Sequence, residues 1–162
     1  MRTLRTLLVL TIVSTYSFNT NAQTMTKDQK KSEETFIKYA DEALALMKQE
    51  ALTMNIKGVG LIAYIPGNET TSWTSKMIVV QTTGTPKQNF IAIAHSKASE
   101  MAETLINSGS KVRETKAGEF GYIGGAIKKI DSGYLLASFS GASGEQDLEV
   151  STKVLDWLVA KF

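Results

Sequence analysis

Apolar residues recur every three or four positions in three segments of the chain, which predicts three amphipathic helices. The first stripe starts after Glu33, the second runs through residues 90–105, and the third follows Ser143. Ser143 stands three residues before Gln146, which is the spacing of a capping box, so the third helix is expected to begin there.

Four shorter apolar runs predict strands, at residues 59–65, 77–80, 122–130 and 134–140. Pro66-Gly67 ends the first run, and Asp131-Ser132-Gly133 is a hairpin signal because glycine accepts a positive φ. The predicted order is α-β-β-α-β-β-α, an α+β domain in which helices flank an antiparallel central sheet. One core is expected, containing Leu44, Met47, Ile62, Ala98, Leu105, Leu136 and Leu155.

The first 22 residues have the pattern of a secretory signal peptide. Two arginines precede an apolar run at residues 7–13, and polar and small residues lead to a cleavage point after Ala22. The run is shorter than the about 20 residues that a membrane-spanning helix needs. We therefore expect a periplasmic or extracellular protein with a flexible segment at residues 23–32 and a single domain at 33–162.

Composition narrows the classes of partner and site. The chain has 18 basic and 16 acidic residues, and the signal peptide holds two basic and no acidic ones, so the remaining chain is formally neutral. Without a basic stripe, nucleic acid is not an expected partner. The chain has no cysteine, which excludes disulfides, and one histidine, which excludes metal sites built on two imidazoles.

No catalytic pattern is complete in the sequence. Residues 108–111 fit S-x-x-K, but the SDN and KTG motifs that accompany it are missing, and residues 141–145 do not form G-x-S-x-G. Glu145, Asp147 and Glu149 lie in the first turns of the third helix, whose dipole lowers a carboxylate pKa, whereas a general acid needs a raised pKa. These observations favour a protein that binds rather than reacts.

The segment from Ala94 to Asp147 contains a sequence of motifs with a family resemblance. An A-x-x-K-A helix motif is followed by the Gly124-Gly125 pair, the hairpin signal and an SGA-x-x-x-x-D corner. This order resembles the GlcG/HbpS-like haem-binding family. The resemblance implies a profilin-like α/β sandwich, a homo-oligomer, and haem or a related tetrapyrrole bound in an apolar slot between a helix and the sheet.

Within the segment that carries the resemblance, the candidate cofactor-binding residues are His95, Lys97, Tyr122, Gly124 and Gly125, although the resemblance does not fix which residue ligates the iron. His95 is the candidate iron ligand because it lies at the border of the second apolar stripe, and Lys97 is expected to be an exposed partner for a propionate. A partly buried polar residue at a helix edge is the simpler interpretation of His95. Other side chains able to ligate iron are Tyr64, Met77, Met101, Tyr122 and Tyr134.

Two further alternatives stay open at this point. The glycine-rich corner at residues 141–144 leads into a helix and is a candidate for holding a carboxylate or propionate, although close packing of a strand on a helix explains it more simply. A haem-degrading or other small-cofactor-processing enzyme is the alternative function. The residues alone do not distinguish haem from a corrinoid, a flavin or a small acid.

Overall fold

Four antiparallel strands form the central sheet, in the order β2-β1-β6-β5. Their bounds are Gly58–Pro66 for β1, Thr74–Val80 for β2, Gly125–Ile130 for β5 and Gly133–Ser140 for β6. The structure is a computed structural model and describes residues 24–162. The signal peptide predicted at residues 1–22 lies outside the described residues.

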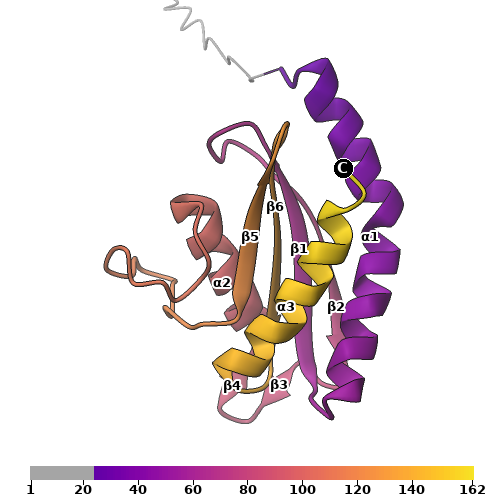
Figure 1. The fold of residues 1–162 in the computed structure, drawn as a ribbon. Helices are drawn as coiled ribbons and strands as arrows, with labels where there is room; N and C mark the ends of the chain where they lie inside the picture. Colours follow the sequence, from indigo (N-terminus) through magenta and orange to yellow (C-terminus); the bar gives the residue numbers. More distant parts are fainter. Residues whose placement is uncertain (1–23) are drawn as a thin grey trace, which may run out of the picture.

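Helices cover both faces of this sheet (Figure 1). Helix α1 (Lys27–Thr53) and helix α3 (Gly144–Val159) lie side by side on one face, and helix α2 (Phe90–Thr104) lies on the other. The predicted order of helices and strands is confirmed. Two short strands that the sequence did not predict, β3 (Gly84–Thr85) and β4 (Gln88–Asn89), form a small hairpin just before α2.

The two central strands bury side chains on both faces, which divides the interior into two layers. Because successive side chains of a strand point to opposite faces, Ile62 and Phe139 pack under α1 and α3, whereas Leu61 and Leu136 pack under α2. The prediction of one continuous core is therefore wrong. Leu105, which was expected in that core, lies at the end of α2 and is only half-buried.

Helix α1 begins at Lys27 rather than at Glu33. A capping box explains the earlier start: the backbone N–H of Gln29 donates to Thr26 Oγ1 at 3.2 Å, and the backbone N–H of Thr26 donates to Gln29 Oε1 at 2.8 Å. Residues 27–32, which were expected to be flexible, are therefore helical. The equivalent prediction for α3 is confirmed by the capping box of Ser143 and Gln146.

Strand β5 begins at Gly125 rather than at Tyr122, and residues 105–124 form a long irregular connection that we call the 105–124 loop. This loop lies beside α2 (Figure 1).

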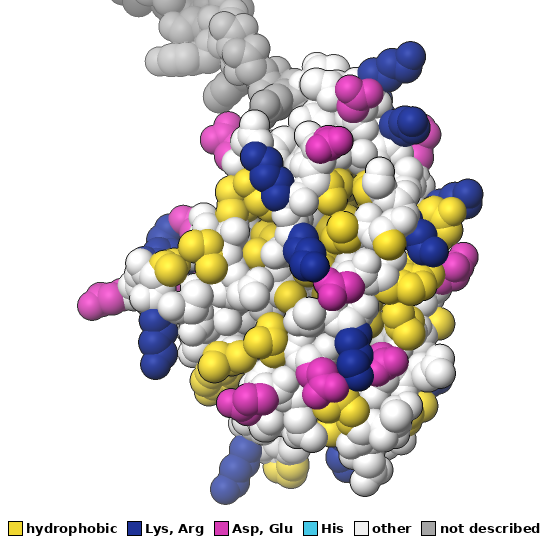
Figure 2. Space-filling model, viewed as in Figure 1, with side chains coloured by type: hydrophobic (Ala, Val, Ile, Leu, Met, Phe, Trp, Pro, Cys, Tyr) yellow, Lys and Arg dark blue, Asp and Glu magenta, His cyan; other side chains and the backbone are white. Residues whose placement is uncertain are grey.

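On the face formed by α1 and α3, basic and acidic side chains are interspersed and hydrophobic side chains are exposed between them (Figure 2). Within residues 24–162, no helix combines the length and the apolar character needed to cross a membrane.

Candidate functional site

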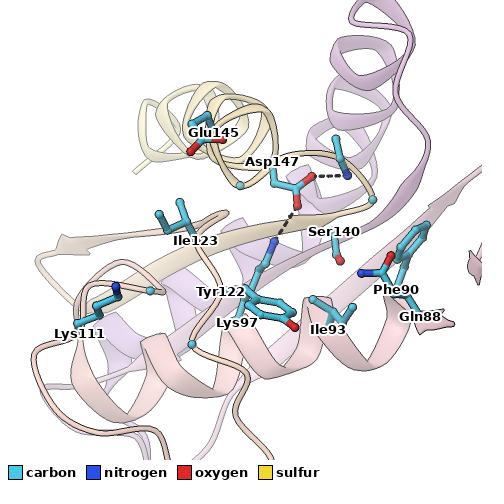
Figure 3. Close-up of a pocket in the computed structure, with 15 residues that line it drawn as sticks. Gln88, Phe90, Ile93, Lys97, Lys111, Tyr122, Ile123, Ser140, Glu145 and Asp147 are labelled. Atoms are coloured by element: carbon cyan, nitrogen blue, oxygen red, sulfur yellow. Dashed lines mark hydrogen bonds and ion pairs between the residues drawn. The ribbon is translucent and has the colours of Figure 1, made fainter.

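The candidate site is a pocket of about 460 Å³ where α2, the 105–124 loop and the corner between β6 and α3 meet (Figure 3). Phe90 and Ile93 of α2 and Ile123 of the loop supply apolar walls, and Tyr122 lies at its edge. Ligand pockets in proteins commonly have volumes of about 300–1,000 Å³ and mostly apolar walls with a few polar groups. This pocket is therefore large enough for a small organic molecule.

A buried ion pair lies beneath these apolar walls. The ammonium group of Lys97 donates to Asp147 Oδ2 at 2.8 Å and to the backbone carbonyl of Phe139 at 2.7 Å. The side chains of Lys97 and Asp147 are only 3% and 4% exposed, although both line the pocket. The expectation of an exposed Lys97 is therefore wrong. Lys97 lies on the buried face of α2, where its charge requires a partner.

Asp147 also fixes the corner through which β6 enters α3. Its Oδ1 accepts a hydrogen bond from the backbone N–H of Ala142 at 3.1 Å, while its Oδ2 accepts one from the ammonium group of Lys97. A carboxylate in the first turn of a helix is favoured by the helix dipole. The sequence interpretation gave Asp147 only this helix-end role, so it missed the contact with Lys97 that brings α2 and α3 together.

Burial works against the charged form of both partners. It lowers the pKa of Lys97 and raises the pKa of Asp147, while each charge partly reverses the effect on the other. The mutual attraction of the pair and the hydrogen bonds from Ala142 and to Phe139 favour the ionised form and oppose this effect of burial. Loss of either member would leave the other as an uncompensated buried charge.

Gly124 and Gly125 have packing roles and do not line the pocket. Gly124 has φ +132°, and a Cβ on it would lie 2.3 Å from Lys97 Nζ and 2.6 Å from Asp147 Cβ. A Cβ on Gly125 would lie 2.6 Å from Cε of Met101. The glycine pair thus lets β5 begin directly against the buried ion pair and against the side chain of Met101 on α2.

His95 and the pocket lie on different sides of α2. His95 is two residues from both Ile93 and Lys97, which corresponds to about 200° around an α-helix. The ring is half-buried, and its Nδ1 lies 2.9 Å from the carbonyl oxygen of Ile91. His95 is not among the pocket residues. The residues of the pocket therefore do not fit a haem whose iron is bound by His95.

The other candidate iron ligands also differ in position. Tyr64 and Met101 are fully buried, and the hydroxyl of Tyr64 bonds to Ser132. Met77 lies on β2, outside the pocket, and Tyr134 packs on the α2 side of β6. Tyr122 alone of these five lines the pocket. Residues 24–162 contain no group of three or more His, Cys, Asp and Glu side chains arranged to hold a metal ion.

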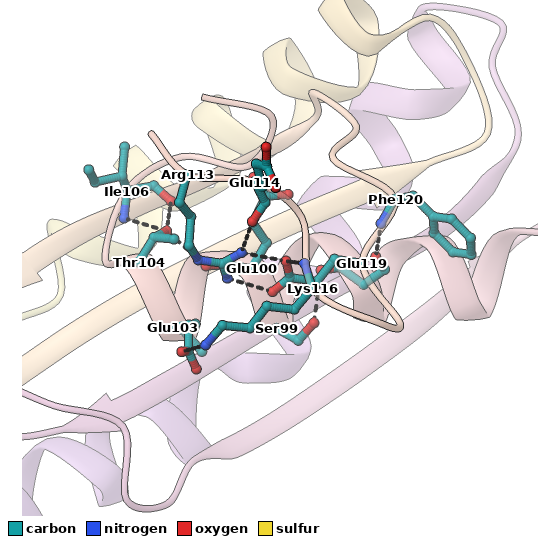
Figure 4. Close-up of polar contacts among 12 residues, drawn as sticks. Ser99, Glu100, Glu103, Thr104, Ile106, Arg113, Glu114, Lys116, Glu119 and Phe120 are labelled. Atoms are coloured by element: carbon teal, nitrogen blue, oxygen red, sulfur yellow. Dashed lines mark hydrogen bonds and ion pairs between the residues drawn. The ribbon is translucent and has the colours of Figure 1, made fainter. Parts of the chain in front are cut away.

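Charged contacts fasten the 105–124 loop to α2 (Figure 4). Arg113 binds both carboxylate oxygens of Glu119, at 2.8 and 2.7 Å, and Lys116 pairs with Glu103 of α2. The bond from Arg113 is the main cause of the low pKa of Glu119, about 2. The backbone N–H of Phe120 donates to Ser96 of α2 at 2.9 Å. The loop is thereby held where Tyr122 and Ile123 border the pocket.

Two aromatic side chains of this loop are exposed beside the pocket. The rings of Phe120 and Tyr122 stack with centroids 5.6 Å apart and an angle of 20° between their planes, and each residue is 48% exposed. Of the two stacked rings, that of Tyr122 lines the pocket.

No family model, no curated protein and no solved structure matches this chain.

Proposed function

We propose that this protein binds a small ligand in the pocket between α2, the 105–124 loop and α3. The observation that carries the proposal is the combination of apolar walls with a buried, charged pair at Lys97 and Asp147. A second hollow of about 540 Å³ lies near Ser132 and Phe162, but all the charged residues that line it are exposed. The N-terminal sequence supports an exported protein, so the ligand would be met outside the cytoplasm.

Haem or a related tetrapyrrole is the ligand that the resemblance favours, and we propose it on that basis. When bound, such a group would supply redox or ligand-exchange chemistry at its iron. Two arrangements are possible on this fold. A tetrapyrrole bound through His95 would lie against the outer side of α2, whereas one in the pocket would lie against Tyr122, with Lys111 at the rim.

An absorption titration with haemin tests this proposal. Binding is expected to shift the Soret band. If haem lies against the outer side of α2, His95→Ala should lower the haemin affinity about tenfold; if it lies in the pocket, Tyr122→Phe should do so. A tenfold change in affinity corresponds to about 1.4 kcal/mol. Lys153→Met, which changes an exposed residue of α3, is the matched control and should leave the titration unchanged. The absence of any Soret shift with the unchanged protein contradicts haem binding. If neither His95→Ala nor Tyr122→Phe weakens haemin binding, both arrangements are contradicted.

We further propose that the chain forms a homo-oligomer. Helix α2 leaves β2 uncovered on its face of the sheet, where Met77 and Val79 are 37% and 38% exposed. A formally neutral chain with such a surface has little charge repulsion against a second copy. Light scattering at micromolar concentration should give a mass above that of one chain, and Val79→Lys should lower it. A monomer mass for the unchanged protein contradicts the proposal.

A further inference from the structure

The ammonium group of Lys97 has more hydrogen-bonding capacity than its protein partners use. A lysine ammonium carries three N–H donors. Among residues 24–162, Lys97 Nζ has two acceptors, the carbonyl of Phe139 and the carboxylate of Asp147. The side chain of Lys97 lines the pocket and is only 3% exposed, so an acceptor for the third N–H would have to come from a molecule in the pocket rather than from bulk water.

The charges that line the pocket determine which acceptor suits this donor. Lys97 and Lys111 are balanced by Glu145 and Asp147. A ligand carboxylate next to Lys97 would stand beside Asp147 and give the buried floor a net negative charge, which is costly in a poorly hydrated site. A ligand cation would meet the ammonium itself. An uncharged oxygen accepts the hydrogen bond without either penalty.

We infer that the pocket takes a small uncharged molecule with a carbonyl oxygen beside an apolar ring, and that Lys97 donates its third N–H to that oxygen. Phe90, Ile93 and Ile123 would surround the ring, and Asp147 would hold Lys97 in place. The inference rests on the part of the proposed function that places a ligand in this pocket. Because the propionates of haem are charged, the inference excludes the arrangement in which haem lies in this pocket.

Three probes of similar shape test the inference: acetophenone, with an uncharged carbonyl, benzoate, with a carboxylate, and toluene, with no oxygen. Each is titrated into the ¹⁵N-labelled protein while the backbone amide signals of Gly121, Gly141 and Gly144 are followed, since these glycines line the pocket. Acetophenone should move these signals with a Kd about tenfold below that of either other probe. Benzoate binding as tightly as acetophenone overturns the inference.

A double variant removes the donor without leaving a buried charge. Lys97→Met combined with Asp147→Leu replaces the ion pair by apolar side chains, which proteins often tolerate. In this variant the affinity for acetophenone should fall about tenfold, to the level of toluene, while the affinity for toluene is unchanged. Lys153→Met is the matched single lysine-to-methionine control. An unchanged preference for acetophenone in the double variant overturns the inference.

The comparison separates this inference from the proposed function. If toluene moves the amide signals of the pocket and acetophenone binds no more tightly than toluene, the role of Lys97 is overturned, but the pocket still binds a ligand. If none of the three probes moves the pocket amides, both the inference and the pocket proposal fail. Should the double variant not fold, the three titrations of the unchanged protein still decide the inference.

Discussion

The contact between Gly124 and the Lys97–Asp147 pair limits what the residue at position 124 can be. Gly124→Ala would place a methyl group 2.3 Å from Lys97 Nζ on a backbone with φ +132°. Gly118 is the matched control, since its φ is +93° but a Cβ there would meet nothing within 4 Å. Gly124→Ala should therefore lower the free energy of unfolding by about 1–3 kcal/mol more than Gly118→Ala does, measured by urea denaturation. Equal losses would contradict the close packing.

The ion pair itself gives a second prediction at the scale of residues. Asp147→Asn keeps the shape of the side chain but leaves the Lys97 ammonium buried without a counter-charge, so it should lower the free energy of unfolding by about 3–5 kcal/mol. The Lys97→Met, Asp147→Leu double variant should recover most of that loss. Lys153→Met, whose side chain is 47% exposed, should cost only about 0–1 kcal/mol. A loss for Asp147→Asn as small as that of Lys153→Met would contradict a buried pair.

The family resemblance predicted Lys97 as an exposed partner for a propionate, and its burial was not predicted. The position of Lys97 among Ala94, Ala98 and Met101 in the second apolar stripe was a signal of burial that the prediction did not use. Its partner Asp147 is 50 residues away. Helical periodicity describes one element at a time, so it contains no information on which residue of another helix will meet Lys97.

The start of helix α3 was predicted correctly from the sequence, because its capping box and its apolar spacing agree. Leu155 is fully buried between α3 and the sheet, so Leu155→Ala should lower the free energy of unfolding by about 2–5 kcal/mol. Leu52→Ala on α1 is the matched control, because Leu52 is 43% exposed and should change stability by no more than about 0.5 kcal/mol. Equal effects in chemical denaturation would be inconsistent with the placement of Leu155.

The 105–124 loop gives a prediction about pH. The pKa of Glu119 is about 2 in the folded protein, well below its ordinary value of 4.5, mainly because of the bond from Arg113. A lowered pKa means that this contact stabilises the loop fully above pH 4.5 and loses its effect as pH falls from 4.5 to 2. Arg113→Met should raise the pKa of Glu119 toward 4.5, measured by NMR titration of the carboxyl carbon. A pKa that stays near 2 would mean that another group holds Glu119.

Element boundaries were less predictable than the elements. Polar residues at 27–32 resembled a flexible segment, because the apolar stripe of α1 only begins at Phe36. The capping pair Thr26 and Gln29, three residues apart, was the signal for the true start. Strands β3 and β4 have only two residues each, which is too short for any periodic pattern to reveal.

At the scale of the whole molecule, the sequence predicted the order of elements but not the two interior layers. The apolar run of β1 is continuous, which is typical of a strand covered on both faces. That pattern does not say which helix covers which face. The pocket forms only where α2 on one face meets the start of α3, reached from the other face, at the end of β6, so the site depends on an arrangement that no single segment encodes.

The pairing of β1 with β6 also has a consequence for how the chain folds. Their register joins Pro66 to Gly133 and Val59 to Ser140, so the centre of the sheet forms only when the intervening residues 67–132 have been closed into a loop. Closing long loops costs chain entropy before any native contact compensates it, which slows folding. Until β6 arrives, the hairpin of β1 and β2 keeps an open edge, a state in which a chain is prone to aggregate. Assembly of this sheet should therefore be limited by the capture of β6.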